Sequence, residues 1–172
     1  MRPFHLIVSG LVAFASLPPV QIFAQTAVSD QPLFLKYPTI PQFTITLSNG
    51  SSFTKANLKK EPTLIMLFSV DCEFCKHETE ELISHMGEFK NDQIIMVTPF
   101  RVDEMTAYYK NYNISKYPVI TMGSDPQRWL TSSFYSLKYF PGLYVYNRNQ
   151  KLVYHFEGSQ KIDTLVHYLN QK

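Results

Sequence analysis

Cys72 and Cys75 are the only cysteines of this 172-residue chain, and two residues separate them. If Cys75 lies in the first turn of a helix, Cys72 lies at its N-terminal end, where unpaired N–H groups and the helix dipole favour a thiolate. A structural disulfide closing so short a loop would restrict the unfolded chain very little. The spacing therefore predicts a redox pair that opens and closes reversibly.

The segments on either side of the two cysteines can place them in this way. Residues 63–69 are almost wholly apolar, as in a strand that is buried on both faces of a sheet. From Thr79 to Met86, apolar residues recur at the i, i+3, i+4, i+7 spacing of one helical face. We therefore expect a buried strand to end just before Cys72 and a helix to begin there.

The rest of the chain alternates between strand and helix patterns. Hairpins are predicted at 43–54 and 143–156, single strands at 93–98 and 119–122, and helices at 103–112, at 126–137 with Asp125 as its cap, and after Gly158. Strands that alternate with helices and end in a hairpin indicate one mixed sheet covered by helices on both faces. The predicted fold class is an α/β sandwich.

The N-terminus has the pattern of an export signal. Arg2 precedes an apolar run over residues 6–15, and Ala24 supplies a small residue for cleavage. We predict a signal peptide over 1–24, an irregular lead-in over 25–40 and the folded domain over 41–172. An uncleaved signal that anchors the chain to the membrane is the alternative, although the run is shorter than the roughly 20 residues of a spanning helix.

Several kinds of site are disfavoured by the residues present. The formal net charge is +2 and the basic residues are scattered, so nucleic acid is not an expected partner. Haem attachment would need a histidine directly after the second cysteine, where this chain has Lys76. His77 and His85 lie near the cysteines but lack the second ligand cluster of a zinc finger. We expect neither a metal nor another cofactor.

Three stretches of the sequence resemble one known family. They are Phe43 to Phe53 with its Asn-Gly turn, Cys72 to Glu78, and Phe140 to Tyr146. Together they resemble the TlpA/ResA-like exported thiol–disulfide oxidoreductases of the thioredoxin-like superfamily, from about Pro41 to Leu169. The resemblance implies a thioredoxin-like fold with an N-terminal β-hairpin and an enzyme that exchanges thiols and disulfides.

The resemblance also implies a role for each of five residues. Cys72 would be the exposed nucleophile and Cys75 the buried resolving thiol. Pro141 would be a cis-proline facing them, and Phe140 would offer backbone groups to an extended substrate. Glu78 would assist proton transfer near the thiols, and its i, i+3 spacing from Cys75 puts both on one face of the helix.

The family context also sets the expected partners and direction. It implies protein thiols and disulfides as substrates, a membrane-bound or other exported thiol reductase as electron donor, and a location in the bacterial periplasm. The family's usual tryptophan before the first cysteine is replaced by Asp71, and the frequent proline before the second by Phe74. Negative charge at Asp71 and Glu73 opposes a thiolate at Cys72 and so favours a reductant.

Other functions remain open from the sequence. The same thiol pair could work as a disulfide oxidase or isomerase, or the domain could be a non-catalytic, redox-sensitive binding or assembly module. A peroxidase is disfavoured, because Ser69 occupies the place of the threonine or serine in the peroxiredoxin motif but Ile65 stands where its proline should be.

Overall fold

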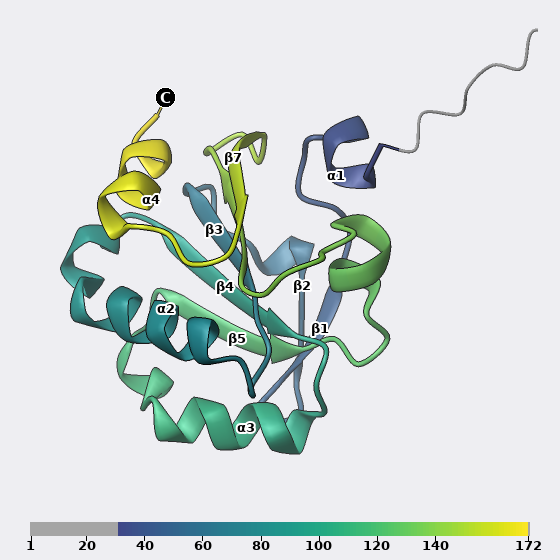
Figure 1. Ribbon diagram of the computed structural model, residues 1–172, viewed down its shortest axis with the longest axis vertical. Helices are drawn as coiled ribbons and strands as arrows, with labels where there is room; N and C mark the ends of the chain where they lie inside the picture. Colours follow the sequence, from purple (N-terminus) through teal and green to yellow (C-terminus); the bar gives the residue numbers. More distant parts are fainter. Residues whose placement is uncertain (1–30, 172) are drawn as a thin grey trace, which may run out of the picture. The chain divides into compact units, whose positions relative to one another are not determined.

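A seven-stranded mixed sheet forms the centre of the domain (Figure 1). The computed structural model describes residues 31–171, so the predicted signal peptide over 1–24 and residues 25–30 of the lead-in lie outside the described residues. The strands are β1 (Thr44–Leu47), β2 (Ser52–Thr54), β3 (Thr63–Leu67), β4 (Gln93–Thr98), β5 (Ile120–Ser124), β6 (Gly142–Tyr146) and β7 (Leu152–Glu157). Their order in the sheet is β2-β1-β5-β4-β3-β6-β7.

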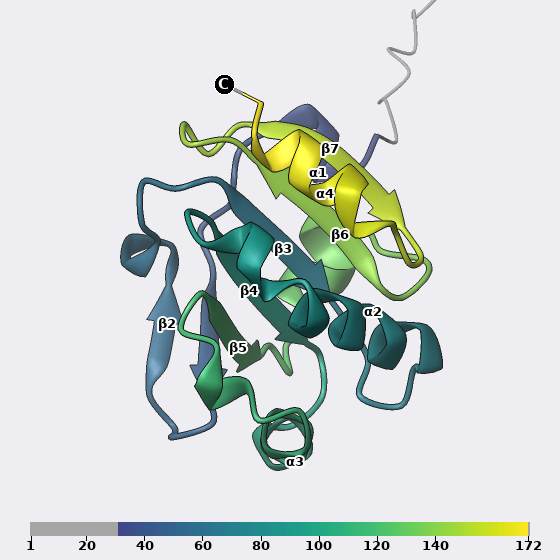
Figure 2. The ribbon, with the colours of Figure 1, turned by 90° about the vertical axis from the view of Figure 1, so that its left-hand side faces the viewer.

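Helices cover both faces of this sheet, which confirms the predicted α/β fold. One face carries α2 (Glu73–Ser84), α3 (Val102–Asn111) and α4 (Ile162–Leu169), and Figure 2 shows α2 and α4 in front of the strands and α3 below them. The opposite face carries α1 (Leu33–Lys36) and η4 (Trp129–Phe134), a π-helical segment. Short 3-10 turns are η1 (Lys55–Asn57), η2 (Met86–Phe89) and η3 (Ile114–Lys116).

Strand β3 is the central strand that leads to the cysteines. It pairs in parallel with β4 and antiparallel with β6. Its side chains alternate between two cores, with Leu64 and Met66 facing α2, α3 and α4, and Ile65 and Leu67 facing the other layer. All four are fully buried, and each contributes about 2 kcal/mol to folding. The predicted strand is therefore correct and rigidly held.

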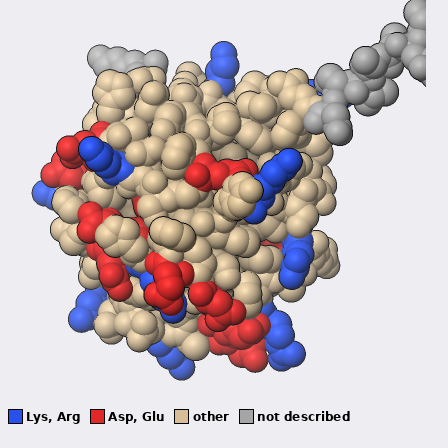
Figure 3. All heavy atoms as spheres, in the orientation of Figure 1, with Lys and Arg blue, Asp and Glu red and all other residues tan. Residues whose placement is uncertain are grey.

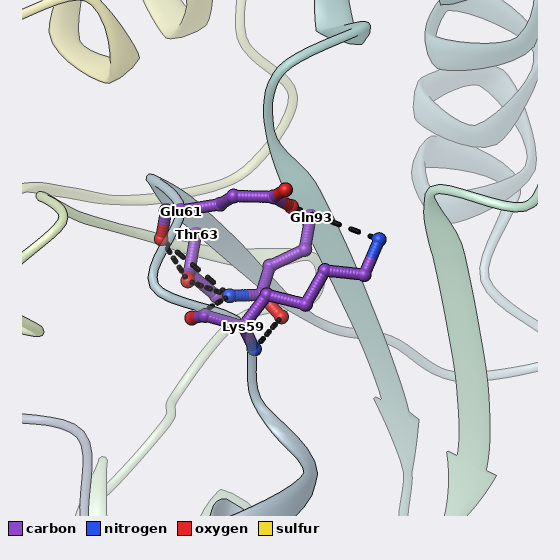
Figure 4. A network of polar contacts seen from close by, with 4 residues as sticks. All are labelled: Lys59, Glu61, Thr63 and Gln93. Atoms are coloured by element: carbon purple, nitrogen blue, oxygen red, sulfur yellow. Dashed lines mark hydrogen bonds and ion pairs between the residues drawn. The ribbon is translucent and has the colours of Figure 1, made fainter.

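Strand β3 is also fixed at its start, at the end of the sheet opposite to the cysteines. The buried Gln93 carboxamide donates to the carbonyl oxygen of Lys59 and to Thr63 Oγ1, both at 2.9 Å, and accepts the Lys59 N–H at 3.1 Å (Figure 4). Lys59 also lies 3.8 Å from the Glu61 carboxylate, but this ion pair is exposed and contributes little. The amide contacts join the approach to β3 with the first residue of β4.

The lead-in predicted as irregular over 25–40 contains ordered structure in its described part. Helix α1 buries Phe34 in the second core, and Ile40 is fully buried. Thr39 forms a β-bridge with Lys151. The folded core therefore begins before residue 41. Pro32 and Pro38 flank a helix of only four residues, which is too short to give a helical period in the sequence.

The helix predicted over 126–137 is much shorter than expected. Arg128 has φ of 57° and Ser136 has φ of 51°, and both left-handed residues interrupt a helix. Only η4 forms between them. Arg128, not Asp125, is the N-cap residue of η4, but Asp125 still bonds its first turn, because its Oδ2 accepts the N–H of Leu130 at 2.8 Å.

Close packing between β1 and β5 gives a stability prediction. A Cβ atom on Gly123 would lie 2.7 Å from two side-chain atoms of Ile45 and 2.9 Å from its Cβ. Gly123→Ala should therefore lower the free energy of unfolding by about 1–3 kcal/mol, measured by urea denaturation. Gly87→Ala is the matched control, since nothing lies within 4 Å of its added Cβ. Equal stability of the two variants would contradict the packing described here.

Candidate active site

The two cysteines lie where β3 passes into α2. Cys72 is the N-cap residue of α2, with extended backbone angles, and the Cys75 N–H donates to its Sγ at 3.2 Å. Cys72 is partly exposed, whereas Cys75 is fully buried, and both are free thiols. The partly exposed sulfur thus faces solvent at a helix N-terminus, where backbone N–H groups stabilise negative charge.

The loop before β6 faces this pair. The Phe140–Pro141 peptide bond is cis, as the resemblance implies. The carbonyl oxygen of Phe140 lies 3.7 Å from Cys72 Sγ. The structure therefore brings the loop that contains Phe140 and Pro141 to Cys72 from nearly 70 residues further along the chain.

Glu78 lies one turn after Cys75 on the inner side of α2, with 1% of its surface exposed. Its Oε2 accepts the N–H of Gln160 at 2.9 Å, and Oε1 is buried without a hydrogen-bond partner among the described residues. Burial raises the pKa of Glu78 to about 7, although the Gln160 N–H and the Ser159 hydroxyl oppose this shift. Unlike its exposed neighbour Glu80, Glu78 is a buried carboxyl that titrates near neutral pH.

The buried Cys75 thiol must lose its proton to a base before it can act as a nucleophile. Burial raises the pKa of Cys75 well above its usual value, and its hydrogen bond with Cys72 and the charge of Glu78 act in the same direction. Cys75 therefore stays protonated until a nearby group accepts its proton. The Glu78 carboxyl group is buried on the same helix α2, and burial raises its pKa to about 7.

Nine of the 14 acidic residues lie between residues 71 and 104, which include the cysteines and α2. Figure 3 shows acidic side chains gathered over the part of the surface where α2 and α3 lie. Glu73, directly after Cys72, is in an ion pair, since Lys76 Nζ lies 2.6 Å from Glu73 Oε1. Glu73 was predicted to place negative charge beside Cys72, but Lys76 offsets part of that charge. Asp71 is therefore the exposed carboxylate that remains next to the motif.

A model of the AhpC/TSA family matches residues 38–155, which are more than half of the chain. This chain belongs to the AhpC/TSA family. As a member it is a redox enzyme of the thiol–disulfide type, and the resemblance found in the sequence is confirmed at the level of family and thioredoxin-like fold. No curated protein matches it in sequence.

Solved structures share the fold of this AhpC/TSA protein at low sequence identity. An exposed lipoprotein thioredoxin from Streptococcus pneumoniae aligns with a TM-score of 0.62 and 16% identity over 75% of this chain and 98% of that chain. A secreted Mycobacterium tuberculosis disulfide oxidoreductase homologous to E. coli DsbE aligns with a TM-score of 0.62 and 19% identity, over 74% of this chain and 94% of that chain. A peroxiredoxin-like protein from Aquifex aeolicus aligns with a TM-score of 0.61 and 14% identity, over 76% of this chain and 83% of that chain.

The site of this AhpC/TSA protein includes residues that the sequence did not single out. Tyr108 donates from α3 to the Cys75 carbonyl oxygen at 3.2 Å, and Thr79 Oγ1 donates to the same oxygen at 2.8 Å. Ser159 and Gln160 approach α2 from the β7–α4 connection. The contacts of Tyr108, Ser159 and Gln160 join residues that are distant in sequence, so no pattern along the chain marks them, whereas Thr79 bonds a carbonyl only four residues earlier in the same helix.

Exposed aromatic side chains come from both segments that carry the thiol site. Phe74, between the cysteines, is 68% exposed, and Tyr139, directly before Phe140, is 72% exposed. Other aromatic residues of the same stretch, such as Tyr135 and Tyr144, are buried in the second core instead. Phe74 and Tyr139 are therefore available to contact a substrate.

Within residues 31–171, no group of three or more His, Cys, Asp or Glu side chains is arranged to hold a metal ion. None of the helices in that range has the length and apolar character that a membrane span requires.

Proposed function

We propose that this protein is an exported thiol–disulfide oxidoreductase that reduces disulfide bonds of protein substrates through the Cys72/Cys75 dithiol. The observation that carries the proposal is the position of Cys72 Sγ. It accepts the Cys75 N–H at 3.2 Å and lies 3.7 Å from the Phe140 carbonyl oxygen, while a buried thiol follows it in the same helical turn. An accessible nucleophile beside a buried resolving thiol is what two-step exchange requires.

In the first step the Cys72 thiolate attacks one sulfur of a substrate disulfide. A mixed disulfide forms, and the other substrate sulfur leaves as a thiolate that takes up a proton. In the second step Cys75 loses its proton to the Glu78 carboxylate and attacks Cys72 Sγ. The substrate's second sulfur leaves as a thiolate that takes up a proton, and a Cys72–Cys75 disulfide remains. Two electrons have passed from the dithiol to the substrate disulfide, and the two protons that the cysteines lose, to solvent and to Glu78, balance the two that the substrate sulfurs take up.

The substrate would approach as an extended polypeptide beside the Phe140–Pro141 bond. The Phe140 carbonyl oxygen points towards Cys72 and can accept a backbone hydrogen bond from that polypeptide. Phe74 and Tyr139 offer apolar contact area around the sulfur. These contacts favour protein substrates over small disulfides.

Export is supported by the signal-like residues 1–24. It is also supported by two of the structural neighbours, an exposed lipoprotein thioredoxin and a secreted disulfide oxidoreductase. We therefore place the protein in the bacterial periplasm, either released after cleavage near Ala24 or held by an uncleaved anchor. Outside the cytoplasm a dithiol becomes oxidised unless electrons are supplied. A membrane-bound or other exported thiol reductase must therefore regenerate it.

A second candidate is the same exchange in the oxidising direction. The Lys76–Glu73 ion pair favours it, because it offsets part of the negative charge that argued for a reductant. The equilibrium of the Cys72/Cys75 pair with glutathione separates the two. A potential near that of a strong oxidant such as DsbA, about −120 mV, would overturn the reducing assignment.

The function itself is tested with the purified chain and insulin. The reduced protein should cleave insulin disulfides, and Cys75→Ser should accumulate a mixed disulfide with insulin through Cys72. The double variant Cys72→Ser/Cys75→Ser is the control and should form none. Consumption of hydrogen peroxide without insulin cleavage would contradict the proposal. Covalent capture of a single partner without turnover would instead support a redox-sensitive binding module.

A further inference from the structure

A cavity of about 430 Å³ opens at the end of the sheet opposite to the cysteines. Three parts of the chain line it. Asp92 comes from the approach to β4, Arg148 from the turn between β6 and β7, and Asn170 from the end of α4. The volume is in the range of small-molecule sites in proteins. None of the residues that line this cavity belongs to the thiol site, so a ligand bound here would be separate from the dithiol.

Asp92 is a buried carboxylate of this cavity that lacks a partner among the described residues. Only 6% of its surface is exposed, and within residues 31–171 its side chain forms no hydrogen bond or ion pair. A buried charge is costly unless it is paired and hydrogen-bonded. Burial accordingly raises the pKa of Asp92 to about 6. Because Asp92 lines the cavity, a cationic donor that enters the cavity would supply the missing partner.

Two other parts of the lining also favour a cation in this cavity. Helix α4 ends at Leu169, and its unpaired carbonyl groups give the C-terminal end of the helix a partial negative charge. Glu88 lines the same cavity and adds a second carboxylate. A ligand with an ammonium group therefore meets negative charge from Asp92, from Glu88 and from the end of α4.

Arg148 adds the opposite charge to the same cavity. It forms no ion pair with Asp92, although its positive charge lowers the pKa of that carboxyl group. The turn that carries Arg148 is fixed, because Asn147 Oδ1 accepts the N–H groups of Asn149 and Lys151 at 3.0 and 3.1 Å. A cation and an anion thus line one cavity without forming an ion pair, which suits a ligand that carries both charges.

Five of the ten residues that line the cavity carry carboxamide side chains, which donate and accept hydrogen bonds as a peptide group does. They are Asn91, Asn147, Asn149, Asn170 and Gln171. We propose that this cavity binds a short peptide as a zwitterion, with the peptide's ammonium group on the Asp92 carboxylate and its carboxylate on the Arg148 guanidinium. This binding site goes beyond the proposed function and does not depend on it.

The test is isothermal titration calorimetry of the full-length protein with the dipeptide alanyl-alanine at about pH 7, where Asp92 is mostly ionised and the peptide's amino group mostly protonated. Asp92→Asn should weaken binding by about 10- to 100-fold, the effect of one charge-assisted hydrogen bond. Asp163→Asn is the matched control, since Asp163 is exposed in the first turn of α4 and does not line the cavity. No binding to the unmodified protein, or equal affinity of the two variants, would overturn the proposal.

Peptides with blocked ends cover the case in which Asp92→Asn does not fold. N-acetyl-alanyl-alanine lacks the ammonium group and should bind the unmodified protein at least about 10-fold more weakly than alanyl-alanine does. Alanyl-alanine amide lacks the carboxylate, so Arg148→Gln should weaken the binding of alanyl-alanine but not that of the amide. Equal binding of the free and the acetylated peptide by the unmodified protein would contradict an ammonium site at Asp92.

The chain's own Lys172 is the alternative occupant of the cavity. It follows Gln171, which lines the cavity, and it lies outside the described residues. Lys172→Gln should leave the affinity for alanyl-alanine unchanged. Binding that appears only in Lys172→Gln would show that the ammonium group of this lysine fills the site, and the peptide assignment would then be wrong.

Discussion

Replacement of Cys72 by alanine is expected to reduce the rate of insulin reduction by at least about 1,000-fold, to the uncatalysed level, because the attacking sulfur is gone. Cys75 cannot replace it, since that thiol is fully buried and burial raises its pKa well above the usual range. Cys75→Ala should keep the first step and form one mixed disulfide per protein. Pre-steady-state mass spectrometry of the insulin reaction distinguishes the two variants.

The matched control for Cys72→Ala is Cys72→Ser. Alanine also removes the side-chain cap of α2, which should cost about 1 kcal/mol of folding stability. Serine keeps an oxygen that can accept the Cys75 N–H but is a far weaker nucleophile at neutral pH. We expect both variants to lose activity equally and only the alanine variant to lose stability. Substantial insulin reduction by Cys72→Ser would refute the assignment of Cys72 as nucleophile.

The strand–cysteine–helix unit could be predicted from the sequence because its signals are local. An apolar run long enough for one strand, a helical period after it and two cysteines between them identify β3, Cys72 and α2 without any distant contact. The two hairpins carry equally local turn residues. The mixed sheet with helices on both faces followed from the alternation of strands and helices, whereas the order of its seven strands was not predicted.

The parts that sequence reasoning missed depend on contacts across the fold. The burial of Glu78 results from packing against residues 158–160, which lie some 80 positions later. Arg128 and Ser136 adopt left-handed backbone conformations that shorten the expected helix. Neither residue type is among those enriched in that conformation, so the sequence does not predict it. The Lys76–Glu73 pair is visible as an i, i+3 spacing, but its effect was not weighed against the neighbouring acidic residues.

Glu78→Gln should make the protein more stable above neutral pH. Burial raises the pKa of Glu78 from 4.5 to about 7 in the folded state, so the folded state holds this proton more tightly than the unfolded state does. The resulting stabilisation is complete below about pH 4.5 and is lost as the pH rises through about 7. Relative to acidic pH, the charged carboxylate therefore costs about 3 kcal/mol at pH 8.

The glutamine variant lacks this titration, so its free energy of unfolding should fall less between pH 5 and pH 8 than that of the unmodified protein, and the fall that remains is the part due to Asp92, whose pKa burial raises to about 6. Its gain at pH 8 should be about 1–3 kcal/mol, because a neutral amide replaces a buried charge and its oxygen can still accept the Gln160 N–H. Urea denaturation at several pH values measures the difference. Parallel stability curves for the two proteins would show that Glu78 does not titrate in this range.

The same substitution should slow the release of the second substrate thiol by about 100-fold at pH 7, because Cys75 loses the group that accepts its proton. Asp92→Asn is the control. Burial raises the pKa of Asp92 to about 6, but it lies before β4, at the end of the sheet opposite to the cysteines. Asp92→Asn should flatten the curve of unfolding free energy against pH at lower pH, and it should leave the rate of thiol–disulfide exchange unchanged. If Glu78→Gln gains stability but releases product at the normal rate, the buried carboxyl group is not the base of the second step.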